Sequence, residues 1–222
     1  MKINSLASTP VIADLAEAGF YLEWVSDLYS RKLNYKNAIP GLLKWLPRID
    51  NLDVKEDIVR ALSVPWAKSI AAPALIAEFY KLQNESNIGI KWTIANALSV
   101  VADDLVFMEI VDLVRDHRNG KAREMLALSL GNMKEPRAQD VLIGLLEDEE
   151  VAGHAIMALG KLKSIKAYQT IERFLNNPRA WVRKEAKKAL GKIAKEKDRT
   201  PVPAERPAPL APAGRYKTRN NE

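Results

Sequence analysis

Apolar residues recur along the chain with the spacing of amphipathic helices, and this spacing is itself repeated. One ten-residue pattern carries apolar or small residues at its first, fifth, eighth and ninth places. At 100° per residue, these four places share one face of a helix. The five copies of the pattern are VKEDIVRALS from Val54, IKWTIANALS from Ile90, AREMLALSLG from Ala122, VAGHAIMALG from Val151 and VRKEAKKALG from Val182.

A second helix-like segment precedes each copy, so the pattern predicts a series of two-helix units. We call the preceding segment helix A and the ten-residue copy helix B. The helix A segments are centred on Leu42, Leu75, Ile110, Leu142 and Ile171. Between helix A and helix B the chain carries Asn, Asp, Gly or Pro, which are typical of turns and helix caps.

The recurrence of the same residues indicates a stack of units rather than a single bundle. The ninth place of the copy is always Leu, and the eighth is always Ala or Ser. A single hairpin cannot bury its apolar face, whereas stacked hairpins bury their faces in one continuous core. The sequence therefore predicts an all-α stack in which the small residue permits close helix contact.

The helix B string VRKEAKKALG from Val182 resembles HEAT repeats, in particular the short bacterial HEAT-like repeats of phycobilisome lyases. The helix A strings after Pro40 and Pro73 share this resemblance, which covers about residues 36–197. It implies a right-handed α-solenoid, a superhelix of about five HEAT-like hairpins. It also implies that helix B lines the concave side.

Two flanking segments complete the predicted organisation. Residues 1–35 carry apolar residues at helical spacing with a break at Gly19, and we interpret them as N-terminal capping helices on the repeat domain of residues 36–197. Residues 198–222 contain five Pro residues and almost no large apolar residues. This composition predicts a disordered, Pro-rich basic tail.

The composition favours a cytoplasmic, non-enzymatic protein. The chain has no Cys, and neither a signal peptide nor a membrane-spanning stretch is expected. Its two His residues, His117 and His154, have no partner at metal-ligand spacing, so we expect no metal and no cofactor. Because Gly-rich phosphate loops and nucleophile motifs are also missing, we expect no catalytic residues.

The net charge of +6 is unevenly distributed. Residues 1–150 hold 17 basic and 22 acidic residues, whereas residues 151–199 hold 13 basic and 4 acidic residues, so the balance changes from −5 to +9. A basic C-terminal end favours an acidic partner or nucleic acid. The alternative interpretation is a solvated, Lys-rich helix face.

The third and seventh places of helix B lie opposite the core face and form the candidate binding surface. These places give the groove an apolar centre and a basic end, and aromatic anchors often dominate interfaces. A rotation of the helices or a covering segment would be the alternative. The candidate partner-binding residues are Trp92, Asn96, Leu128, Met157, Lys184 and Lys188.

The second place of helix B forms a basic column of Lys55, Lys91, Arg123 and Arg183. The column is either an anion track or a ladder of basic side chains that bond to turn carbonyls and to acidic groups of neighbouring repeats, and we favour the ladder. The resulting hypothesis is a scaffold or adaptor that binds a protein or peptide partner in the concave groove. The alternatives are a nucleic-acid-binding protein related to HEAT-like alkylation-repair glycosylases and a chromophore-lyase-type accessory subunit.

Overall fold

The computed structural model describes residues 2–82 and 88–199, and these residues form helices and turns without any strand. The helix A elements are α3 (Ile39–Trp45), α5 (Ala72–Lys81), α7 (Phe107–Arg115), α9 (Arg137–Gly144) and α11 (Tyr168–Glu172). The helix B elements are α4 (Leu52–Leu62), α6 (Ile88–Val101), α8 (Ala122–Leu130), α10 (Ala152–Leu162) and α12 (Ala180–Arg199).

Short 3₁₀ turns join or extend these helices. They span Lys36–Ala38, Leu46–Arg48, Pro65–Ala67, Asp104–Val106, His117–Asn119, Leu145–Glu147, Ile165–Ala167 and Arg173–Asn176. Polar side chains cap several of these elements, as the turn composition predicts. The side chain of Asn51, for example, accepts a hydrogen bond from the backbone N–H of Val54 at 3.0 Å and caps α4.

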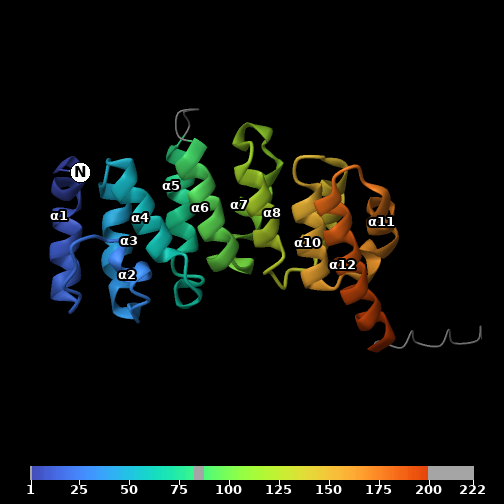
Figure 1. Ribbon diagram of the computed structural model, residues 1–222, viewed down its shortest axis with the longest axis horizontal. Helices are drawn as coiled ribbons and strands as arrows, with labels where there is room; N and C mark the ends of the chain where they lie inside the picture. Colours follow the sequence, from blue (N-terminus) through green and yellow to red (C-terminus); the bar gives the residue numbers. More distant parts are fainter. Residues whose placement is uncertain (1, 83–87, 200–222) are drawn as a thin grey trace, which may run out of the picture.

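Each helix A packs on the helix B that follows it, and successive B helices pack on one another from α4 to α12. Figure 1 shows the resulting row of two-helix units, which runs along the long axis of the molecule in the order of the sequence. The predicted all-α stack of HEAT-like hairpins is therefore confirmed. The right-handed superhelix stays a prediction.

The buried core follows the repeat. The first, fifth, eighth and ninth places of every helix B are buried, and the most exposed of these residues, Leu190, is only 8% exposed. Leu190 lies in α12, the last B helix of the row. The seam between the units is thus built from the residues that the sequence pattern singles out.

The tenth place of helix B requires a small residue because the next helix B lies close to it. A Cβ atom on Gly131 would lie 2.9 Å from the Cα atom of Ala158, and one on Gly160 would lie 2.8 Å from the Cα atom of Ala189. Both alanines occupy the eighth place of the next helix B. Gly191 lies in the last B helix of the described residues, and a Cβ atom there would meet nothing within 4 Å. The glycine therefore lets neighbouring B helices approach closely.

The basic column at the second place of helix B is a structural ladder. Lys55 pairs with the buried Glu78 of the next unit, and Lys91 donates to Asn119 Oδ1 at 3.4 Å. Arg183 donates to the carbonyl oxygens of Asn177 and Pro178 at 2.7 and 2.8 Å. These contacts bear out the favoured interpretation over an anion track.

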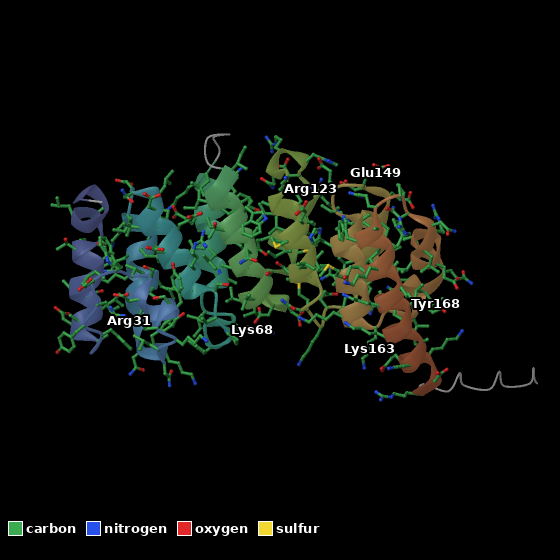
Figure 2. All side chains as sticks on the ribbon, in the orientation of Figure 1. Arg31, Lys68, Arg123, Glu149, Lys163 and Tyr168 are labelled. Atoms are coloured by element: carbon green, nitrogen blue, oxygen red, sulfur yellow. The ribbon has the colours of Figure 1, made fainter. Side chains whose placement is uncertain are left out.

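Arg123 is the most buried member of this ladder, with only 1% of its side chain exposed. Its Nε donates to the carbonyl oxygen of Val114 in its own unit at 2.7 Å. Its other nitrogens bind Asp148 and Glu150 in the turn of the next unit. One guanidinium group thus ties two consecutive repeats together. Figure 2 labels Arg123 in the upper part of the molecule.

The N-terminal residues form α1 (Lys2–Glu17) and the short α2 (Asp27–Ser30), and α1 packs on α3 and α4. The predicted break at Gly19 coincides with a positive φ of 91°. Asp14 of α1 accepts hydrogen bonds from Lys44 Nζ at 2.7 Å and Trp45 Nε1 at 3.0 Å, and the bond from Lys44 lowers the pKa of this carboxyl. Of the predicted tail, Asp198 and Arg199 continue α12, and residues 200–222 lie outside the described residues.

Candidate partner-binding face

The six predicted site residues lie on four successive B helices. Trp92 of α6 and Met157 of α10 are 39% and 37% exposed. Asn96 and Leu128 are half-exposed, and Lys184 and Lys188 are exposed. All six therefore have surface accessible to a partner.

Three of the six residues meet in one pocket. Leu128 of α8, Met157 of α10 and Lys188 of α12 line a cavity of about 310 Å³ between the three helices. Trp92, Asn96 and Lys184 lie outside its lining. The sequence analysis missed the other residues that line this cavity, which are Ser99, Asn132, Ala158, Gly160, Lys161, Glu185, Ala189 and Lys192.

Some of the pocket-lining residues that the sequence analysis missed could have been found from helical spacing. Lys161 and Lys192 each follow a predicted site residue by one helical turn, at four residues beyond Met157 and Lys188. Asn132 could not have been found in this way, because it lies in the turn after α8. Its amide donates to the carbonyl oxygen of Ser99, and its Oδ1 accepts from Lys161. This turn residue therefore connects three consecutive B helices at the pocket edge.

The third place of helix B is Gly153 in the fourth copy, for a reason that the sequence pattern did not reveal. The indole of Trp181 covers Gly153, so that a Cβ atom there would lie 2.0 Å from a ring carbon of Trp181. Trp181 also contacts the ring of His154 at 5.4 Å between centroids. It thus packs the start of α12 on α10, although Trp181 as a whole is 41% exposed.

The two histidines lie in different environments. Burial lowers the pKa of His154, against the opposing effect of Glu124, whose carboxylate lies 4.0 Å away. His117 is largely exposed and lies 3.8 Å from Asp148. Within residues 2–82 and 88–199, no cluster of three or more His, Asp or Glu residues could hold a metal ion.

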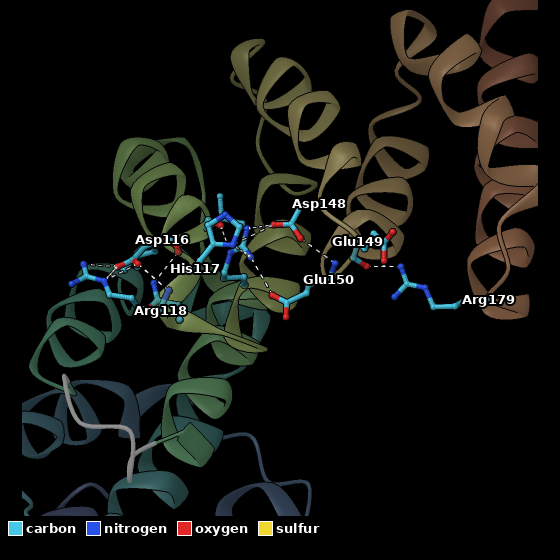
Figure 3. Close-up of polar contacts among 11 residues, drawn as sticks. Asp116, His117, Arg118, Asp148, Glu149, Glu150 and Arg179 are labelled. Atoms are coloured by element: carbon cyan, nitrogen blue, oxygen red, sulfur yellow. Dashed lines mark hydrogen bonds and ion pairs between the residues drawn. The ribbon is translucent and has the colours of Figure 1, made fainter.

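The acidic turn at 147–150 serves as an anchor for basic side chains. Figure 3 shows Asp148 and Glu150 beside His117, and Glu149 facing Arg179. Asp148 accepts the backbone N–H of Glu150 at 3.0 Å in addition to its bond from Arg123. Burial acts to raise the pKa of Asp148, but these hydrogen bonds outweigh it and the pKa is lowered. An ionised, already bonded carboxylate is unsuited to general acid catalysis.

No helix among the described residues combines the length and the apolar character that crossing a membrane requires.

The stacked helix pairs, the continuous row of B helices and the shared core define an α-helical repeat solenoid.

Comparison with known families identifies the type of repeat. Residues 145–202 match the family model for HEAT repeats, and residues 122–148 match the model for the PBS lyase HEAT-like repeat. The two matches support a HEAT-repeat family for the C-terminal units of the chain, with one repeat of the PBS lyase type. No curated protein matches the chain.

Proposed function

We propose that the chain is a non-enzymatic, cytoplasmic scaffold or adaptor that binds a protein or peptide partner across its row of B helices, the side that the repeat type implies to be concave. One observation carries the proposal. Trp92, Leu128 and Met157 lie at outward places of three successive B helices, and each retains exposed apolar surface. Exposed apolar residues on the outward places of successive helices favour a contact site.

A capture experiment tests this proposal. The full chain and a Trp92→Ala, Met157→Ala double variant are used as baits, and the bound proteins are quantified by mass spectrometry. Because exposed aromatic and large apolar anchors dominate interface energies, capture of specific partners should fall by about tenfold or more in the double variant.

A matched control separates the helix B face from general surface hydrophobicity. Tyr80 of α5 and Met108 of α7 are also exposed, at 47% and 53%, but both lie on A helices. A Tyr80→Ala, Met108→Ala variant should retain the partners. Equal recovery of partners by the wild type and the Trp92→Ala, Met157→Ala variant would refute the assignment of this face.

Nucleic-acid binding is the second candidate, and the basic residues of α12 favour it. The third place of the two helices beside α6, however, carries the carboxylates Glu56 and Glu124, so the surface around Trp92 repels a phosphate backbone. Steeply salt-dependent binding of duplex DNA would support this candidate. The chromophore-lyase alternative is supported by the repeat type alone.

A further inference from the structure

A row of lysines runs along the exposed side of α12. Lys184, Lys188, Lys192 and Lys195 are all exposed and follow one another at intervals of four, four and three residues. At 100° per residue these positions fall within one narrow face of the helix. Among the described residues, Lys188 of this row has an ion pair, with Glu185 at 2.7 Å. We call these four residues the lysine row.

The lysine row borders the pocket between α8, α10 and α12. Lys188 and Lys192 line the cavity, and Lys161 of α10 adds a third ammonium group. The apolar part of the lining comes from Leu128, Met157, Ala158 and Ala189. An apolar recess therefore lies beside several positive charges.

The size of the pocket limits what can occupy it. Its volume of about 310 Å³ is at the lower limit of sites that enclose whole small ligands. A cavity of this size suits one large apolar side chain that a partner inserts. Such an inserted anchor is the usual centre of a peptide or protein interface.

The apolar recess favours a peptide over a nucleic-acid backbone. A peptide can insert an apolar side chain between Leu128 and Met157, whereas an unbroken phosphate backbone offers nothing to this recess. The excess of basic over acidic residues is also confined to the last units, since residues 1–150 carry a charge balance of −5. A short acidic segment can stay at the basic end, whereas a long polyanion would extend over the acidic units.

We propose that this pocket and the lysine row bind a short acidic peptide segment of a partner protein. One large apolar side chain of the segment enters between Leu128 and Met157, and flanking carboxylates pair with Lys161, Lys188 and Lys192. The inference rests on the proposed scaffold function, because it specifies the chemistry of the partner at one end of the helix B face.

Fluorescence anisotropy with a defined probe tests the inference on the full chain. The probe is a short fluorescein-labelled peptide of glutamates with one central Phe. It should bind the wild type, and a Lys188→Glu, Lys192→Glu variant should bind it more weakly by about tenfold or more, since two attractive charge pairs become repulsive. Met157→Ala should weaken binding by about fivefold or more through lost apolar contact.

Matched controls distinguish this site from general attraction to a basic protein. Lys68 is exposed on the loop before α5, and Figure 2 shows it away from α12. Lys68→Glu therefore reverses one lysine charge at a distance from the pocket, and it should leave probe binding within about twofold of the wild type. A probe with Gln in place of Glu, or with Ser in place of Phe, should bind far more weakly. Circular dichroism checks that every variant keeps the helical content of the wild type.

Three outcomes would overturn the inference: a probe that does not bind the wild type, equal binding by the Lys188→Glu, Lys192→Glu variant, or equal binding of the Phe and Ser probes. Tighter, lysine-dependent binding of a short DNA duplex would also overturn it in favour of nucleic acid. Failure of the probe, with partner capture still lost in the Trp92→Ala, Met157→Ala variant, would remove this inference and leave the proposed scaffold function standing.

Discussion

Arg123→Ala is expected to lower the free energy of unfolding by about 3–5 kcal/mol, because it removes one partner of a buried charge network. The substitution leaves the buried carbonyl oxygen of Val114 and the carboxylate of Asp148 without their guanidinium donor. It also opens a cavity at the junction of two repeats. Urea unfolding, followed by circular dichroism, measures the change.

A surface arginine in the 3₁₀ turn before α8 gives the control. Arg118 is 89% exposed and pairs with Asp116 at 2.8 Å, so Arg118→Ala should change stability by less than about 1 kcal/mol. Similar losses for the two variants would contradict the role of Arg123 as the link between the third and fourth units.

The effect of Arg123 should also depend on pH. The folded-state pKa of Asp148 is lowered, so its ionised form stabilises the fold above the unfolded-state pKa of about 4, and this stabilisation disappears as the pH falls through the lower folded-state pKa. The difference between the wild type and Arg123→Ala should thus be largest above about pH 5 and shrink under more acidic conditions. A difference that stays constant down to acid unfolding would show that Asp148 is not involved.

Gly160→Ala should destabilise the protein by about 1–3 kcal/mol, because the new methyl group would overlap the backbone of the next B helix. Its Cβ atom would lie 2.7 Å from the Cβ atom and 2.8 Å from the Cα atom of Ala189. Relief requires α12 to move away from α10, which opens the shared seam. The unfolding midpoint in urea, with the slope checked for two-state behaviour, reports the change.

Gly191→Ala provides the matched control in the same repeat position. Gly191 lies within α12, and an added methyl group there meets nothing within 4 Å. Because Ala is a better helix former than Gly, this variant should be more stable by roughly 0.5–1 kcal/mol. Two glycines at the same place of the repeat should therefore respond with opposite signs. The same sign for both would contradict close packing between consecutive B helices.

The sequence predicts the fold well because the stack uses the same contacts in every unit. The positions of Ile58, Ile94 and their equivalents follow directly from helical periodicity, and each is fully buried. The ladder of basic residues is also periodic, so the local sequence suffices to find Lys55 and Arg123. A contact that recurs in every repeat requires the same residue type each time, and this recurrence is visible in a single sequence.

The pocket was harder to predict from the sequence, because the contacts that form it do not recur from repeat to repeat. Asn132 reaches Ser99 and Lys161 from a turn, and Trp181 covers Gly153 from one residue before the last copy. Both contacts join residues of different units, at separations that no helical period fixes. The outward places identified Leu128, Met157 and Lys188 correctly as surface residues, but the grouping of these three in one cavity required the structure.

Oxidative footprinting of two methionines tests the central claim most directly. Met157 lies on the B helix α10 and Met108 on the A helix α7, and both are exposed. When the captured partner is bound, hydroxyl-radical oxidation of Met157 should fall by about fivefold or more, since its side chain is then covered, while oxidation of Met108 stays unchanged. Protection of Met108 with continued oxidation of Met157 would place the partner on the A helices and contradict the account.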